Sequence, residues 1–298
     1  MRNVLTFLLL LFSLLCNGQS PKLFTTDKEL SSSLINQIYQ DRNGFIWIAT
    51  EDGLNRYDGA KFTIYKHEPN NEHSLAHNFV RTVFEDSKGH LLIGTYIGIQ
   101  MYDPATDNFT PLAKLEDTGE TLESNINSFI ERKNGEIWVS GNVLCKLDIK
   151  DHLLTVRKVD IAVTSPGSLF EDKKQNVWMA KGEEGVYQLT PDNQLTLHLS
   201  KDNGYVKSIC EDQRGNIYVG SIRKGLFIYD KERKTFVPVD LKEKGELPVC
   251  FLYSGIPNEL YIGTDGKGVA IYNIRTHEIS EYKFDNNYFD SGNSKIHS

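Results

Sequence analysis

The stretch "GFIWIATEDGLNRYDG", residues 44–59, decides the fold. It places Trp47 and two isoleucines in a short apolar run, turns through Glu-Asp-Gly, and continues into a second run that ends in Tyr57 and Asp58. Short runs rich in β-branched and aromatic residues on either side of a glycine turn predict a β-hairpin. Because a lone hairpin is only marginally stable in water, the fold depends on whether this pattern recurs.

The hairpin pattern recurs five more times along the chain. The later copies start at Gly89, Gly135, Gln175, Gly215 and Asn258, so the spacings from Gly44 onward are 45, 46, 40, 40 and 43 residues. A large apolar residue stands three positions after each start. In chain order these residues are Trp47, Leu92, Trp138, Trp178, Tyr218 and Tyr261. A repeat of about 40–45 residues that contains several short strands is the period of a β-propeller blade.

Each copy is interpreted as four strands. The first strand precedes the hairpin and closes at an aspartate such as Asp41 or Asp212, where Asp-x-x-Gly forms a tight turn. The second strand carries the large aromatic residue, the third is of the "GLNRYD" type, and the fourth is weaker, as in "KFTIYKH" at residues 61–67. We expect the aromatic column to be structural and to pack each blade against the next. Its members are Trp47, Trp138, Trp178, Tyr218 and Tyr261.

The predicted fold is therefore an all-β propeller with six complete four-stranded blades and part of a seventh. Residues 22–27, "KLFTTD", are interpreted as an isolated edge strand, and residues 291–298, "SGNSKIHS", as the start of another first strand. Both are expected to belong to the seventh blade, whose middle strands are missing. The chain is accordingly interpreted as the front piece of a longer protein or as a truncated gene product.

The N-terminus has the pattern of a secretory signal peptide, predicted at residues 1–20. Arg2 precedes an apolar run at residues 5–15, and small or polar residues follow. Cys16 leaves a lipoprotein as an alternative, but the bulky Leu15 before it favours soluble export. The propeller, residues 21–298, is then expected in the periplasm. The formal net charge of −7 argues against a nucleic-acid partner.

Three cysteines remain after this segment, namely Cys145, Cys210 and Cys250. All three lie among apolar residues, so we expect buried, unreactive thiols. An odd number cannot pair completely within one chain. A bridge between Cys210 and Cys250 stays open.

The motif "NQIYQDRNGFIWIATEDGLNRYDG", residues 36–59, resembles the two-component regulator propeller repeat, and the resemblance extends over about residues 22–298. The third and fourth copies depart from it, with Arg132 at the turn aspartate and Gln175 at the turn glycine. The resemblance implies the periplasmic sensor region of a hybrid two-component system of Bacteroidetes, whose ligands are commonly oligosaccharides. In longer relatives a second propeller, a β-sandwich, a membrane span, a histidine kinase and a DNA-binding regulator complete the protein. A homodimer is left open.

Candidate ligand-binding residues follow from the face that propellers use, where first strands begin and where the turns between second and third strands project. Four candidates lie eight residues before the hairpin start in their copy, and four lie in the projecting turns. Their amide, guanidinium, ammonium and aromatic groups suit sugar hydroxyls or the carboxylates of acidic sugars. They are Asn36, Arg81, Asn127 and Lys207 in first strands, and Tyr96, Asn142, Arg223 and Lys267 in turns. No catalytic residue, metal or cofactor is expected.

Two alternatives to a sensor remain, a stand-alone protein-binding propeller and an enzyme resembling the streptogramin lyases. The lyase chemistry would need a histidine and a metal-holding acid on the binding face, and no histidine stands at the candidate positions. His67, His73 and His77 are expected in a solvated loop, with metal binding as the alternative. The run "GTDGKG" at residues 263–268 is interpreted as a hairpin turn, because a phosphate loop would precede a helix.

Overall fold

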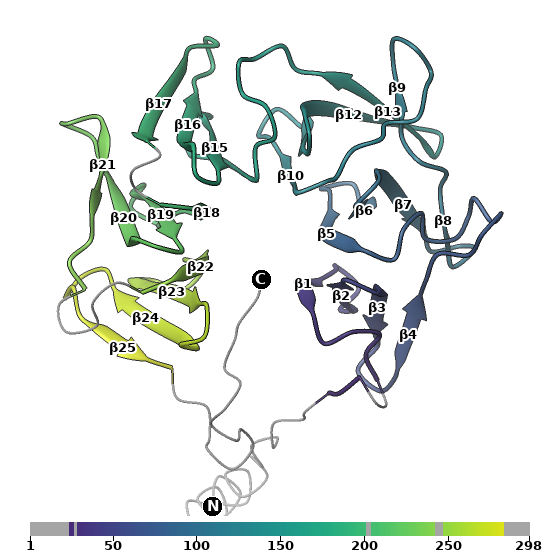
Figure 1. The fold of residues 1–298 in the computed structure, drawn as a ribbon, viewed down its shortest axis with the longest axis horizontal. Helices are drawn as coiled ribbons and strands as arrows, with labels where there is room; N and C mark the ends of the chain where they lie inside the picture. Colours follow the sequence, from purple (N-terminus) through teal and green to yellow (C-terminus); the bar gives the residue numbers. More distant parts are fainter. Residues whose placement is uncertain (1–23, 27–28, 201–203, 242–246, 283–298) are drawn as a thin grey trace, which may run out of the picture.

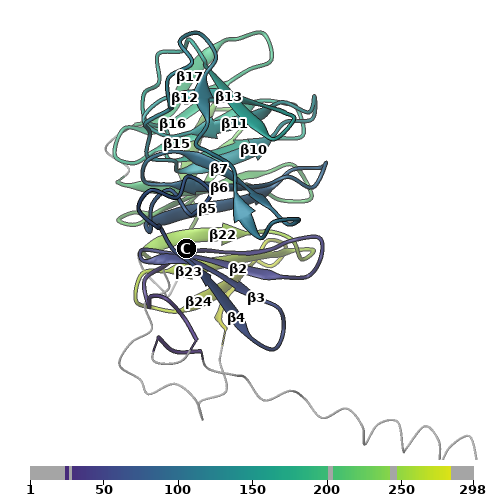
Figure 2. The same ribbon diagram turned by 90° about the vertical axis from the view of Figure 1, so that its right-hand side faces the viewer.

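The computed structural model describes residues 24–26, 29–200, 204–241 and 247–282, and these residues form 25 strands in six sheets. Within this part of the chain there is no helix, and hence none long and apolar enough to cross a membrane. The six sheets are arranged around a common centre (Figure 1). Together they form a disc that is thin along the ring axis (Figure 2). The predicted all-β propeller with six four-stranded blades is confirmed.

The first three blades are built from consecutive strands. Blade one contains β1 (Ile35–Gln40), β2 (Ile46–Thr50), β3 (Gly53–Tyr57) and β4 (Phe62–Tyr65). Blade two contains β5 (Val80–Glu85), β6 (Leu91–Thr95), β7 (Ile99–Asp103) and β8 (Asn108–Phe109). Blade three contains β10 (Ser128–Glu131), β11 (Ile137–Ser140), β12 (Leu144–Lys150) and β13 (Leu153–Lys158). A short strand, β9 (Lys114–Leu115), adds to the outer edge of blade three in parallel with β13.

The other three blades repeat the same antiparallel order. Blade four contains β14 (Ser168–Glu171), β15 (Val177–Lys181), β16 (Gly185–Leu189) and β17 (Leu195–Ser200). Blade five contains β18 (Val206–Glu211), β19 (Ile217–Ser221), β20 (Gly225–Asp230) and β21 (Thr235–Pro238). Blade six contains β22 (Val249–Tyr253), β23 (Glu259–Thr264), β24 (Val269–Asn273) and β25 (Ile279–Glu281). The first strand of each blade faces the ring axis, and each of β1, β5, β10, β14 and β18 contacts the next blade's first strand.

In each of the first five blades the large apolar residue of the second strand, an aromatic except for Leu92 of blade two, packs against the following blade, as predicted. Trp47 is fully buried and shares a core with Val83 and Ile93 of blade two. Trp178 is 1% exposed and shares a core with Val219 of blade five. The core between two blades is thus supplied by both of them.

The turn aspartate holds the buried tryptophan by its indole nitrogen. In blade one, Asp41 accepts hydrogen bonds from Trp47 Nε1 at 2.8 Å and from the Phe45 backbone N–H at 2.9 Å. Blade three has Arg132 in place of this aspartate, and Glu136 supplies the missing carboxylate to Trp138 Nε1 at 3.1 Å. The Arg132 guanidinium lies 4.7 Å from the Trp138 ring centre, which is a cation–π geometry. The departure in the repeat is therefore compensated locally.

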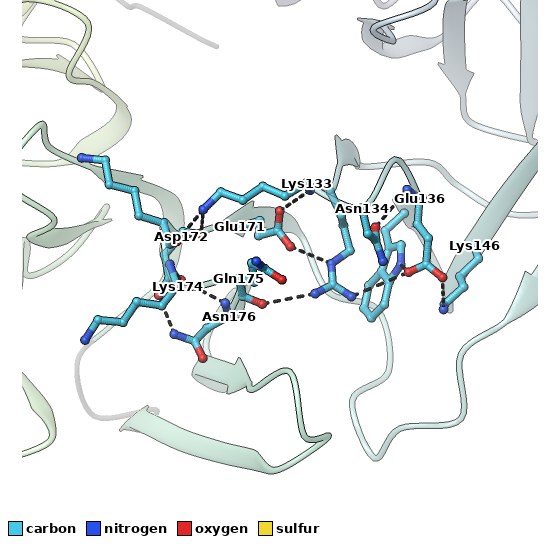
Figure 3. Close-up of polar contacts among 12 residues, drawn as sticks. Lys133, Asn134, Glu136, Lys146, Glu171, Asp172, Lys174, Gln175 and Asn176 are labelled. Carbon is cyan, nitrogen blue, oxygen red and sulfur yellow. Dashed lines mark hydrogen bonds and ion pairs between the residues drawn. The ribbon is translucent and has the colours of Figure 1, made fainter.

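A second set of contacts, which we call the carboxylate latches, joins successive blades. These contacts lie on the face of the disc where the first strands end, opposite to the face where they begin. At four junctions a backbone N–H in the turn after the first strand donates to the last glutamate of the next blade's first strand. The donor–acceptor pairs are Arg42–Glu85, Ser87–Glu131, Lys133–Glu171 and Lys173–Glu211. Between blades three and four, Glu171 also accepts from Arg132 Nε at 2.8 Å (Figure 3).

The two end blades each leave an apolar side chain uncovered. Ile38 of β1 is 62% exposed, whereas the residues at its position in the other five blades are all buried against the preceding blade. These are Val83, Phe129, Leu169, Ile209 and Leu252. At the other end, Tyr261 is only half-buried, whereas Tyr218 in the same column is 2% exposed. A further sheet between blades six and one would cover both faces, which agrees with a partial seventh blade.

The segments assigned to that seventh blade are described only in part. Within residues 22–27 the structure describes Phe24, Thr25 and Thr26, which form no strand. The Phe24 ring instead packs edge-on against Tyr57 and Phe62 at centroid distances of 5.1 and 5.0 Å. Residues 291–298 and the predicted signal peptide at residues 1–20 lie outside the described residues.

All three cysteines in the described residues are buried and free, so the open alternative of a Cys210–Cys250 bridge is not realised in this structure. Burial raises the pKa of the Cys145 thiol to about 11 and that of Cys210 to about 12. Both are therefore protonated at neutral pH, as expected for structural thiols.

We expect the substitution Glu171→Ala to destabilise the propeller by about 2–4 kcal/mol. The Glu171 side chain is 7% exposed. Its loss leaves the Lys133 N–H without its acceptor and removes the closest carboxylate from the largely buried Arg132 guanidinium, which keeps the Gln175 carbonyl and Glu136. The measurement is the free energy of unfolding in urea. The matched control is Glu232→Ala, because Glu232 is exposed and only its backbone N–H makes a contact. Equal effects of both substitutions would contradict the latch.

We expect Gln175→Gly to stabilise the protein by about 1 kcal/mol. Gln175 has φ of 67°, in the left-handed region that the glycines at four of the other hairpin starts adopt. Its contact to Arg132 is made by the backbone carbonyl, so the substitution leaves that contact in place. Thermal unfolding of the variant checks this. A melting temperature below that of the wild type would show that the Gln175 side chain contributes more than its backbone strain costs.

Candidate ligand-binding site

A cavity of about 520 Å³ lies on the ring axis, and every described blade contributes to its wall. Two successive residues of each blade line it, within the first strand or, for Asn127 and Gly167, with the first of the pair just before that strand. The first of each pair are Asn36, Arg81, Asn127, Gly167, Lys207 and Cys250, and the second are Gln37, Thr82, Ser128, Ser168, Ser208 and Phe251. The four first-strand candidates from the sequence are thus all brought together around one cavity.

The position of these candidates coincides with an irregularity in the sheets. In blades one, two, five and six the register between first and second strand shifts at this position, which marks a β-bulge. In blade five, for example, Val206 pairs with Ser221 and Ser208 with Gly220, so that Lys207 has no partner across the ladder. A bulge re-aims the side chain of the extra residue. In these four blades the bulge thus accounts for consecutive residues lining the same cavity, whereas the pairing of first and second strands in blades three and four has no such shift.

Two of the lining amides also join neighbouring blades. Asn36 Nδ2 donates to the Val80 carbonyl of blade two at 2.7 Å. Asn127 Nδ2 donates to the Pro166 carbonyl, just before blade four, at 3.1 Å. These side chains are thereby held in fixed orientations at the cavity wall, which reduces the entropy lost when a ligand binds.

The four candidates from the projecting turns do not line this cavity. Tyr96 is 53% exposed and its ring lies 5.5 Å from that of His77. Arg223 forms an exposed ion pair with Glu183 at 3.0 Å. Asn142 lines a separate depression beside blade three, and Lys267 is exposed in its turn. These residues belong to the surface around the axial cavity.

Sequence reasoning missed Lys181, which also lines the cavity. In four other blades this position at the end of the second strand carries a buried hydroxyl that bonds within the following turn. These residues are Thr50, Thr95, Ser221 and Thr264. Lys181 instead donates to Thr164 Oγ1 at 3.0 Å and pairs with Glu184 at 2.8 Å. Aligning the six copies at this column would have revealed the single lysine.

Aromatic surface is available in the cavity from two further residues. Tyr205, just before β18, and Phe251 of β22 both line it and are 42% and 45% exposed. The Tyr205 ring lies against Gly182, where an added Cβ would come within 2.9 Å of it. Polar groups with a few aromatic faces are the usual composition of a small-molecule site.

The lining of the cavity contains no histidine, aspartate or glutamate among the described residues. The three loop histidines are engaged elsewhere: His67 with the Leu75 carbonyl, His73 with the Phe109 carbonyl and His77 with the Phe79 N–H. In the part of the chain that the structure describes, no group of histidine, cysteine and acidic residues is arranged to hold a metal ion. Residues 263–268 form the hairpin between β23 and β24, as predicted.

Comparison with known proteins supports the same repeats. The family model for the two-component regulator propeller matches residues 29–52, 74–96 and 200–223. A segment of 83 residues is 39% identical to histidine kinase P4 of Formosa agariphila, which covers 26% of this chain and 6% of the kinase.

Solved structures share the fold at low sequence identity. One is described as the extracellular domain of a hybrid two-component system from B. thetaiotaomicron, with 20% identity and a TM-score of 0.74 over 92% of this chain and 38% of that one. Another is a catalytically inactive virginiamycin B lyase from Staphylococcus aureus with quinupristin, with 13% identity and a TM-score of 0.66 over 89% and 87% of the two chains.

The chain covers a different share of the length of each of these relatives. It spans 38% of the solved two-component domain, and its matched segment only 6% of the kinase, so both are considerably longer proteins. The similarity to the lyase shows the fold alone, because identity is low. Three segments of the chain, one in each of blades one, two and five, thus match the two-component regulator propeller repeat.

Proposed function

We propose that this chain is the ligand-sensing propeller of a hybrid two-component system and that it binds oligosaccharides in the axial cavity without catalysing a reaction. The observation that carries the proposal is the cavity wall, to which all six described blades contribute side chains from the same two positions. Amide, hydroxyl, guanidinium and ammonium groups in one wall provide many donors and acceptors for sugar hydroxyls. Tyr205 and Phe251 add apolar faces against which a sugar ring can lie.

The side chains that line the cavity suit ligand binding better than catalysis. General acid–base chemistry uses histidine or carboxylate groups within reach of the substrate, and the described lining has neither. A lyase similar to virginiamycin B lyase therefore receives no support from this cavity, although the fold is shared. A fold accommodates many functions, so the content of the site weighs more than the architecture.

The proposal includes location and partners. We assign residues 1–20 to an export signal and residues 21–298 to a propeller in the periplasm, where glycan fragments arrive. The proposed partners of this part are a second propeller or downstream domains of a longer protein, and the greater length of the two-component relatives supports such further parts. Ligand binding in the cavity would reach those domains through the blades, since each blade shares its core with the next.

Blocking the cavity provides the test. We expect Ser168→Trp to abolish glycan binding, because Ser168 lines the cavity and an indole there occupies the space of a sugar ring. The control is Ser280→Trp, on the exposed outer strand β25. Both variants and the wild type are titrated by calorimetry with a panel of neutral and acidic oligosaccharides, after circular dichroism has verified their fold.

The outcomes separate the parts of the proposal. Binding by wild type and Ser280→Trp with at least a tenfold loss in Ser168→Trp, about 1.4 kcal/mol, supports the cavity as the glycan site. Equal binding by all three proteins moves the site elsewhere on the surface. Failure of the wild type to bind any glycan contradicts the ligand class.

A further inference from the structure

The axial cavity has an unusual charge content for this chain. Arg81 of β5, Lys181 of β15 and Lys207 of β18 line it, and its described wall holds no carboxylate. The chain as a whole has 40 acidic and 33 basic residues, so a wall with cations alone is opposite to the overall charge. We propose that the cavity recognises an anionic group on its ligand, a uronate carboxylate or a sulfate ester of an acidic oligosaccharide. This inference rests on the proposed glycan-binding function.

Two of the three cations are not neutralised by the protein. Neither Arg81 nor Lys207 forms an ion pair with a carboxylate in the described part of the chain. The nearest described aromatic partner of Arg81 is Phe79, whose ring centre lies 5.9 Å from the guanidinium carbon. Some cations elsewhere on this protein are paired, as in Arg42–Glu85 at 2.6 Å and Lys146–Glu136 at 2.5 Å. Arg81 and Lys207 therefore present unmatched charge to the cavity.

The third cation is held in place. Lys181 Nζ is fixed between Thr164 Oγ1 and Glu184, and its side chain is 15% exposed. Blade four carries Gly167 eight residues before its hairpin start, where the other blades have a larger residue, and Gly167 and Lys181 both line the cavity. Because glycine places no side chain there, a ligand can approach the Lys181 ammonium group from the cavity.

These groups suit an anion better than a neutral sugar. A guanidinium fork donates two parallel hydrogen bonds to a carboxylate or sulfate, and such charge-assisted bonds are stronger than those between neutral groups. In a cavity partly shielded from water the attraction is also larger than on the surface. A neutral sugar would partly dehydrate Arg81 and Lys207 without offering a compensating charge.

The experiment compares matched ligands on the full chain. Calorimetry is performed with uronate oligosaccharides and the same compounds after methyl esterification, and with sulfated oligosaccharides and their desulfated forms. We expect the charged member of at least one pair to bind about 10–100-fold more tightly, and its affinity to fall with added salt. The pair that shows the difference identifies the carboxylate or the sulfate as the recognised group.

Variants locate the effect. Arg81→Gln and Lys207→Gln are each expected to weaken binding of the charged ligand about tenfold or more and to leave any binding of the neutral form unchanged. Arg275→Gln and Lys174→Gln are the controls, because both residues are exposed and have no side-chain contact with the cavity. Circular dichroism and thermal melts verify each fold, and the salt dependence of the wild type provides a second measurement that needs no variant.

Each outcome decides the inference. Preference for charged ligands that is lost in Arg81→Gln or Lys207→Gln but kept in the controls supports it. Equal affinity for charged and neutral forms, with binding still abolished by Ser168→Trp, overturns it and leaves the proposed function standing. Absence of binding to every compound by the wild type overturns both.

Discussion

The structure depends on the burial of one large apolar residue per blade, usually an aromatic, against the blade that follows. Trp47 and Trp178 have almost no exposed surface, and the core that buries each of them includes residues of the next sheet. No blade can complete its core by itself, so the sheets must stand around a common axis with their first strands inward. The carboxylate latches hold the opposite ends of the same strands. The axial cavity follows from this arrangement, because six inner strands surround a space that none of them fills.

Much of this architecture could be predicted from the sequence because its residues recur at a fixed distance from the hairpin turn. The first-strand candidates were found for the same reason, since the offset of eight residues brings Arg81 and Lys207 to equivalent places around the axis. The offset did not reveal that a bulge turns these side chains inward. Lys181 was missed because it replaces a turn hydroxyl, and Tyr205 because it precedes a strand, at a position where the residue type differs between blades. The turn candidates Tyr96 and Arg223 share a face with the cavity but do not reach its wall, because the direction of a turn depends on backbone geometry that spacing does not encode.

The extracellular domain of a two-component system and a lyase share this fold, so the fold alone does not distinguish between their functions. In this chain those side chains are amides, hydroxyls and cations. Departures from the repeat are tolerated elsewhere when a neighbour compensates, as Glu136 does where Arg132 replaces the turn aspartate. Blade four shows two departures at the cavity itself, with Gly167 and Lys181 in one sheet. These two changes alter the residues that line the cavity, while the antiparallel pairing of β14, β15 and β16 is retained.

In a β-sheet, the side chain that a residue can carry is usually limited by its role in strand pairing. The bulge in the first strands removes this limit for one residue. A residue inside a ladder is constrained by its cross-strand partner and by the two faces of the sheet. The extra residue of a bulge has no such partner, and here it is asparagine, arginine, lysine or cysteine without any change in the strands on either side. Recognition can therefore diverge at these positions at little cost to folding. In a propeller of this kind the blades can stay the same while the bulge residues around the axis change, so new ligand preferences can arise by single substitutions at those residues.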